Sequence, residues 1–379
     1  MADSGGATAW VWPDLHDAQR TVLLELLIHG STSRAELARR TGLSRTSLTR
    51  LTRNLVELGF VTEGATNAPN GRGRPSEILN LESASANFAG IKLTGEALYA
   101  VVTDLHANVV AIEEQPLVSR SVPDVVDQIA GIVARFRQTH PRLTSVGVCL
   151  AGDVEQVRGT SVVIGSHFLG WDDVPLASLV EAQTGLPVAI SNDVQALTAA
   201  HHWFGAGVGR SSLVLIGLGA GIGAAIVVND ELVGGSHGHP GKVGHLPARH
   251  GGPLCSRGHA GCVSAYVTIP AMLQRAGETT IERVFERAAA GDRVAQGVID
   301  DAGYALGVVM AQLMNVIDPE KVIVTGEGLA VARAGHSAMD AAITERLDLA
   351  AERSEVEVVD FAFADYAWAA AISAIRRVI

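Results

Sequence analysis

From about residue 87 onward, the chain consists of short β-branched runs separated by glycines and by helical segments. Alternating strands and helices of this kind are typical of an α/β body. A chain of 379 residues, 47% of them hydrophobic, can bury a sizeable core but is too long for one ordinary domain, so two or three folding units are expected. The runs that carry this prediction are FAGIKLTG, LYAVVTDL, SVGVCLAG, PVAISND, LVLIGLGAGIGAAIVV and KVIVTGEG.

The charge of the chain is unevenly spread. A formal net charge of −11 discourages nucleic-acid binding, but residues 34 to 74 contain eight arginines against three glutamates, a local charge of +5. The three cysteines are too few for a disulfide framework, and no apolar run approaches the roughly 20 residues of a membrane helix. The start of the chain also lacks the features of a signal peptide. These patterns predict a cytoplasmic protein with a basic front module on an acidic body.

The basic module has the pattern of a helix-turn-helix motif. Apolar side chains recur at helical spacing over residues 17–28, and Ser33 with Glu36 forms a capping box for a short second helix. Gly42 then forces a turn before a third helix with a leucine stripe. The stripe consists of Leu48, Leu51, Leu55 and Leu58. In such an arrangement the second helix of the pair enters the major groove of DNA.

Two short strand-like runs follow and flank an arginine-rich loop, which is the composition of a wing. The predicted DNA contacts are Arg45, Thr46, Ser47 and Thr49 with base edges, Arg50 and Arg53 with phosphates, and Arg72 and Arg74 in a narrow minor groove. The alternative is a solvated helical bundle whose arginines bind nothing.

Two segments of the body carry residues suited to ligand chemistry. The glycine-rich run from Gly217 to Ala225 lets backbone amides approach an anion or a sugar ring, or it is only a tight hairpin. Asn192 and Asp193 stand between an apolar strand and a helix. There the carboxylate accepts a proton from a substrate hydroxyl, or it simply caps the helix.

Taken together, five separated motifs over residues 87 to 379 resemble the ROK family of sugar kinases and sugar-responsive repressors. The motifs are GIKLTGEALYAVVTDL, GWDDVPLASLVEAQTGLPVAISNDVQALTAA, LIGLGAGIGAAIVVNDELVGGSHGHPGKVGHL, CSRGHAGC and DPEKVIVTGEG. The front module matches the repressor branch of that family. The resemblance implies a winged helix-turn-helix domain over residues 14–82 and two actin-like α/β lobes, residues 87–200 and residues 201–379, with a sugar cleft between the lobes and a dimerisation surface on the second.

The chain departs from the kinases of the family at the first strand of the body. Those kinases read Asp-x-Gly-Gly-Thr, a turn that handles ATP phosphates and their metal, whereas this chain reads Lys92-Leu93-Thr94-Gly95-Glu96. Phosphoryl transfer depends on positioning and charge neutralisation. No kinase activity and no ATP binding are therefore expected.

A second departure concerns the family's zinc site, which the resemblance places between residues 241 and 264. Three ligand positions keep their residues, His245, Cys255 and Cys262, but Arg257 replaces the middle cysteine. A closed tetrahedral zinc site then needs a fourth ligand, for which His250 and His259 are candidates. The alternative is a degenerate loop that hydrogen bonds and packing stabilise without metal.

The effector set that the resemblance implies is also altered. Asn192, Asp193 and His245 keep part of the sugar-hydroxyl set, while Lys242 and Ser264 replace two glutamates. One hypothesis is an acidic effector, such as a sugar phosphate or a sugar acid, because lysine is a strong partner for phosphate and carboxylate. The other is that Lys242 pairs with Asp193 and leaves a repressor that answers to no sugar.

The leading prediction is a DNA-binding transcriptional repressor of carbohydrate metabolism that is not an enzyme. It binds a palindromic operator as a homodimer or homotetramer and responds to a sugar or sugar-derived effector in the body. The alternative from another class is a sugar kinase with a DNA-binding head, in which Asp193 is the base. A third is a constitutive DNA-binding protein whose body only dimerises. No membrane partner is expected.

Overall fold

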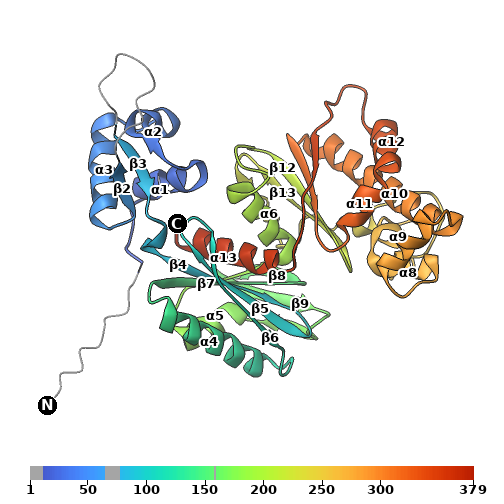
Figure 1. Cartoon of the computed structure of the whole chain (residues 1–379), viewed down its shortest axis with the longest axis horizontal. Helices are drawn as coiled ribbons and strands as arrows, with labels where there is room; N and C mark the ends of the chain where they lie inside the picture. The colour runs from blue at the N-terminus through green and yellow to red at the C-terminus, as the bar shows by residue number, and fades with distance from the viewer. Residues whose placement is uncertain (1–11, 65–76, 158) are drawn as a thin grey trace. The chain divides into compact units, whose positions relative to one another are not determined.

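The computed structural model describes residues 12–64, 77–157 and 159–379. The chain forms two compact units, Met1–Ala196 with Tyr366–Ile379, and Leu197–Asp365. Figure 1 shows the path of the chain through both units. In the described part of the chain, no helix is both long enough and apolar enough to cross a bilayer.

The first unit begins with the winged helix-turn-helix that the sequence predicts. Its elements are α1 (Asp17–His29), β1 (Thr32–Ser33), α2 (Arg34–Thr41), α3 (Arg45–Glu57), β2 (Val61–Gly64) and β3 (Ile78–Leu81), with the strands paired antiparallel in the order β1-β3-β2. The backbone N–H of Glu36 donates to the Ser33 hydroxyl, and that of Ser47 donates to the Ser44 hydroxyl, so each helix of the motif has its own N-cap. Gly42 ends α2 in the left-handed conformation, with φ of 69°.

The buried face of α3 differs from the predicted stripe at one position. Leu48, Leu51 and Leu55 are buried, but Leu58 is 44% exposed. Leu58 is the C-cap residue, one position beyond the last residue of α3 at Glu57, so it lies at the end of the buried stripe and not within it. Phe60 is fully buried in the next segment.

The α/β part of the first unit is built on a five-stranded sheet in the order β11-β7-β4-β5-β6. The strands are β4 (Asn87–Leu93), β5 (Ala97–Asp104), β6 (Val109–Pro116), β7 (Leu143–Leu150) and β11 (Val188–Asn192). One face packs on α4 (Val122–Thr139) and α5 (Leu176–Thr184) in a shared apolar core. The segment between β7 and α5 forms a small sheet of β8 (Asp153–Val157), β9 (Thr160–Ser166) and β10 (Trp171–Val174).

The last helix, α13 (Ala364–Val378), covers the other face of this sheet (Figure 1). A Cβ on Gly90 would lie 2.0 Å from the Ala367 carbonyl oxygen, and one on Gly147 would lie 1.8 Å from that of Ala370. Only glycine allows the helix backbone to approach so closely. The structure therefore differs from the predicted second lobe of residues 201–379, because its last 14 residues pack with the first unit.

The second unit repeats the strand order of the first. Its sheet runs β14-β13-β12-β15-β16, in which β12–β14 form an antiparallel meander and β15 and β16 add in parallel. The strands are β12 (Leu213–Leu218), β13 (Ile222–Val228), β14 (Glu231–Leu232), β15 (Lys321–Thr325) and β16 (Glu355–Val358). The helices are α6 (Asp193–Phe204), which enters from the first unit, α7 (Ser264–Val267), α8 (Ile269–Ala276), α9 (Ile281–Ala289), α10 (Arg293–Ile317), α11 (Leu329–Ala334) and α12 (His336–Arg346). Side chains of α10, α11 and α12 form one core with the sheet.

Candidate nucleic-acid interface and metal cluster

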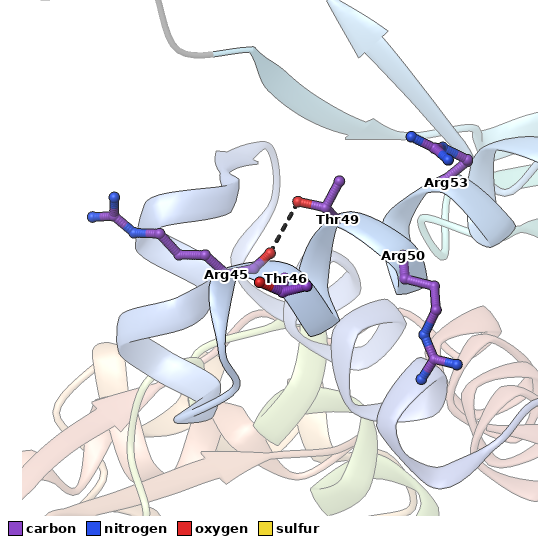
Figure 2. Close-up of a pocket in the computed structure, with 5 residues that line it drawn as sticks. All are labelled: Arg45, Thr46, Thr49, Arg50 and Arg53. Atoms are coloured by element: carbon purple, nitrogen blue, oxygen red, sulfur yellow. Dashed lines mark hydrogen bonds between the residues drawn. The ribbon is translucent and has the colours of Figure 1, made fainter.

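The exposed side of α3 forms a shallow concavity of about 360 Å³. It is lined by Arg45, Thr46, Thr49, Arg50 and Arg53, which Figure 2 shows along one helix. The leucines of α3 face the opposite way into the core of the domain. The amphipathic helix thus brings together five of the six residues that the sequence predicts on it for DNA contact.

The three arginines of α3 are exposed, and within the described residues none of them makes an ion pair or a side-chain hydrogen bond. Arginine with no protein acceptor keeps its full set of donors for phosphate oxygens or for the acceptors on guanine. The sequence-predicted arginines of this helix are therefore both accessible and unneutralised.

The hydroxyl groups of α3 are less available than the sequence suggests. Ser47 accepts a hydrogen bond of 2.9 Å from the Ser44 hydroxyl and is half-buried. The Thr49 hydroxyl donates to the Arg45 carbonyl at 2.9 Å. Because the Thr49 proton is already donated, Thr49 is suited to apolar or water-mediated contacts more than to direct donation, whereas Ser47 only accepts from Ser44 and keeps its own proton. Thr46 is exposed beside Arg45.

The arginines of α2 are in a different state. Arg34 donates to Thr52, Glu63 and Glu77, and so ties α2 to α3 and to both ends of the wing segment. Arg39 and Arg40 both donate to Glu36. Hydrogen bonds from these two guanidinium groups lower the pKa of Glu36 to about 2.

The wing arginines Arg72 and Arg74 lie outside the described residues. The strands that precede and follow this segment, β2 and β3, pair from Val61 with Leu81 to Gly64 with Ile78. The minor-groove contacts of Arg72 and Arg74 stay predictions.

In the second unit, four side chains of the types that bind metals converge in one cluster: His245, Cys255, His259 and Cys262. Their ligand atoms all lie within 4.8 Å of one another. A tetrahedral zinc ion, with bonds of about 2.0 Å to nitrogen and about 2.3 Å to sulfur, sets its ligands roughly 3.3–3.8 Å apart. The cluster is slightly wider than such a site, and its two thiols and two imidazoles are zinc's preferred ligands.

The backbone explains how this loop gathers its ligands. The Cys255 N–H donates to the His259 carbonyl at 2.9 Å, which folds residues 255–259 into a turn and brings both side chains to the same side. An isolated bridge between Pro247 and Cys262 then joins the turn to the segment of His245. Of the two candidates for the fourth ligand, the structure brings His259 into the cluster.

In this cluster, the pKa shifts of His245 and Cys255 favour the deprotonated forms that bind metals, and the shift of Cys262 does not. Burial, together with Arg257 and His259, lowers the pKa of His245 and favours the neutral imidazole. Burial opposes ionisation of Cys255, but backbone hydrogen bonds from Arg257 and His259 outweigh it and lower the pKa of that thiol. Burial and the Cys255 sulfur raise the pKa of Cys262. Of the two thiols, Cys255 is therefore the more readily ionised.

The predicted effector residues divide between the two units. Asn192 and Asp193 end β11 and begin α6 in the first unit, where both cap the helix: the Val194 N–H donates to each side chain at 2.9 Å. The other Asp193 oxygen accepts from the Lys92 ammonium at 2.8 Å, a partner that the sequence reading missed. The only feature of the sequence that points to this pair is the lysine itself, which interrupts the apolar run Phe88–Leu93. Lys242 and His245 lie together in the second unit, where Lys242 precedes the 3₁₀ turn Val243–His245.

Comparisons with known proteins agree with this arrangement. Residues 88–373 match the ROK family, and residues 14–73 match the MarR family of DNA-binding domains. The xylose repressor of Caldicellulosiruptor bescii is 26% identical over 329 residues, which cover 80% of this chain and 81% of that protein. The transcriptional dual regulator NagC of Escherichia coli K12 is 27% identical over 320 residues, covering 79% and 77%.

Solved structures show the same fold. A ROK family transcriptional regulator that is a homologue of E. coli Mlc matches 94% of this chain and 95% of its own, with a TM-score of 0.80 and 24% identity. A ROK family glucokinase from Streptomyces griseus matches 77% of this chain and all of its own, with a TM-score of 0.65 and 23% identity. The relatives that align over most of both chains are a xylose repressor and a transcriptional dual regulator, which supports a sugar-responsive regulator and not an enzyme. The chain therefore belongs to the ROK family, with a kinase-like body joined to a winged helix-turn-helix domain.

Proposed function

We propose that this protein represses genes of carbohydrate metabolism by inserting α3 into the major groove of a palindromic operator, as a homodimer or homotetramer in the cytoplasm. The observation that carries the proposal is the unneutralised set of Arg45, Arg50 and Arg53 on the exposed side of the recognition helix. In this proposal Arg45, at the start of α3, contacts a base edge, and Arg50 and Arg53 contact phosphates. The two-fold symmetry of such an operator matches a symmetric oligomer.

The effector is a sugar or a sugar derivative, and among these we favour an acidic one. Relatives are named for xylose and N-acetylglucosamine, which are neutral. In this chain, however, Lys92 offsets the charge of Asp193, so an anionic effector meets no uncompensated carboxylate at that residue. Lys242 adds a positive charge where the family has a glutamate. A sugar phosphate or sugar acid fits that charge balance better than a neutral sugar.

The metal that fits the second unit is zinc, bound by His245, Cys255, His259 and Cys262. The donor set of two thiols and two imidazoles supports this assignment, and the ion would crosslink the loop as a structural site. His259 takes the role that a third cysteine has elsewhere in the family.

The DNA and effector proposals are tested together. Purified protein is used to select duplexes from a random pool, and its affinity for the selected site is measured with neutral sugars, sugar phosphates, sugar acids, and ATP with magnesium. The proposal is supported if the selected duplex is a palindrome and an acidic sugar lowers the affinity of the protein for it. If only a neutral sugar lowers the affinity, the proposal of an acidic effector is wrong. If the selection yields no preferred sequence, the proposal of a specific operator is wrong.

The zinc proposal is tested by metal content and by melting temperature before and after chelation. About one zinc per chain and a fall in melting temperature on chelation are expected, since a ligand of the native state stabilises it. Cys255→Ser should lose the metal, whereas His250→Ala, which changes the histidine outside the cluster, should keep it. Metal-free protein that chelation does not destabilise would contradict the assignment.

A further inference from the structure

Lys92 is a buried charge in the middle of the first unit. It lies on β4, whose residues Phe88 to Leu93 are all buried, and it is only 4% exposed. Removing an ammonium group from water is costly unless it is paired and hydrogen-bonded. Moving a partner of Lys92 away would leave a buried charge unpaired, which costs free energy. The partners are therefore held in place.

Lys92 contacts two segments that are far apart in the sequence. Its ammonium is 2.8 Å from an oxygen of Asp193, and it lies 4.1 Å from the centroid of the Tyr366 ring. The first contact is a charge-assisted hydrogen bond and the second a cation–π interaction. Both are shielded from water, since the side chains of Lys92 and Asp193 are only 5% and 14% exposed.

The two partners stand where the chain passes between its units. Asp193 begins α6, and the chain enters the second unit after Ala196. It returns to the first unit at Tyr366, in the first turn of α13. One side chain thus touches both crossing segments, which we define as residues 193–199 and residues 362–368.

A neighbour of Lys92 fixes the second crossing from the same sheet. Cys149 on β7 is opposite Lys92 in the strand register, and its thiol donates to the Tyr366 carbonyl at 3.2 Å. Complete burial raises the pKa of Cys149 to about 12, so the sulfur keeps the proton that it donates. The ring of Tyr366 and its backbone are therefore both held by adjacent strands.

We infer that Lys92 is a positioning residue that couples the two crossing segments of the chain. A shift of either segment breaks a contact of the ammonium and alters the contact with the other segment. The coupling is built within the first unit, and it is independent of which sugar or operator the protein binds.

Hydrogen exchange of the full-length protein, measured by mass spectrometry without DNA or sugar, tests this inference. Asp193→Asn removes the counter-charge, and Tyr366→Leu removes the ring. Each variant is expected to accelerate exchange about tenfold in the crossing segment that it does not alter, as well as in its own. Lys92→Met should accelerate exchange in both.

Matched controls separate coupling from general loss of stability. Lys321→Met removes another buried lysine, which pairs with Glu355 and Glu357 in the second unit, and it should leave both crossing segments unchanged. Tyr366→Phe keeps the ring and should leave residues 193–199 unchanged. Amides of β7 report any global unfolding in the same samples. If Lys92→Met does not fold, the single-partner variants still decide.

The inference is wrong if Asp193→Asn and Tyr366→Leu each affect only their own segment. It is also wrong if Lys321→Met accelerates both crossing segments as much as Lys92→Met does, because then any buried lysine would have the effect.

Discussion

Helices α2 and α3 each carry three arginines, but the two sets are in opposite electrostatic states. The arginines of α2 are paired with glutamates of the same domain. In the described part of the chain, those of α3 have no such partner. Between these two helices, the positive charge that is not offset by a glutamate is therefore concentrated on the recognition helix. A count of charges over the sequence treats the six arginines alike, and only their pairing separates them.

The largest expected effect is that of Arg45→Ala on operator affinity. A good contact between arginine and a base edge contributes about 1–3 kcal/mol, so the loss should be about 5–150-fold per half-site and confined to one base position. Binding of wild-type and variant protein to operators mutated at single positions measures it. Arg39→Ala on α2 is the matched control and should change affinity by less than about twofold.

A uniform loss across all operator variants would place Arg45 on a phosphate instead. An equal loss from Arg39→Ala would remove the distinction between the two helices.

Arg50→Ala should have a smaller and less specific effect. As a phosphate contact, it should weaken binding to operator and to random duplex alike, and it should reduce the slope of log affinity against log salt by about 1. Titration at several salt concentrations measures this slope. An unchanged slope with a lost base preference would assign Arg50 to base recognition.

Much of this contrast is absent from the sequence because it depends on distant partners. Helical periodicity, the Ser33 cap and the turn at Gly42 were enough to predict α2 and α3, since caps, turns and stripes are local features. The pairing of Arg34 with Glu63 and Glu77 joins residues 29 and 43 positions away. Periodicity contains no information on such pairs.

Sequence patterns also fail to predict the distant contacts of the α/β body. The inner strands of both five-stranded sheets were predicted from their β-branched runs, but the edge strands β6, β14 and β16 were not. Of these, β6 is mostly exposed and ends in EEQP. The return of α13 to the first sheet depends on the absence of a Cβ at Gly90 and Gly147, which a sequence pattern cannot distinguish from a turn glycine. For the metal cluster, the sequence predicted three ligands and two candidates for the fourth, and only the turn at residues 255–259 separates the candidates.

Arg34→Ala should act on stability more than on DNA. Arg34 is 23% exposed and joins α2 to Thr52 and to two glutamates that are themselves 39% and 64% exposed. Solvent screening reduces the value of such pairs, so a loss of about 1 kcal/mol in the free energy of unfolding of the winged-helix domain is expected. Chemical denaturation followed by the fluorescence of Trp12, which packs on Phe60, measures it. A larger change in DNA affinity than in stability would show that Arg34 also contacts DNA.

The smallest expected effect is that of Glu36→Gln, which releases Arg39 and Arg40 from their shared partner. Affinity for random duplex should rise severalfold at low salt, because two further guanidinium groups become available to phosphates. Glu57→Gln removes an equal charge from α3, where in the described structure the carboxylate makes no ion pair, and it should raise affinity less.

Glu36→Gln should also change how the free energy of unfolding depends on pH. Because Arg39 and Arg40 hold the pKa of Glu36 at about 2 in the folded protein, below its value of about 4.3 in the unfolded chain, the stabilising contribution is complete above pH 5. It declines as the pH falls toward 2. The difference in stability between wild type and Glu36→Gln should therefore be constant from pH 5 to 7 and disappear near pH 2, as measured by denaturation at each pH. A difference that persists at pH 2 would mean that Glu36 stabilises the domain by packing and not by neutralising α2.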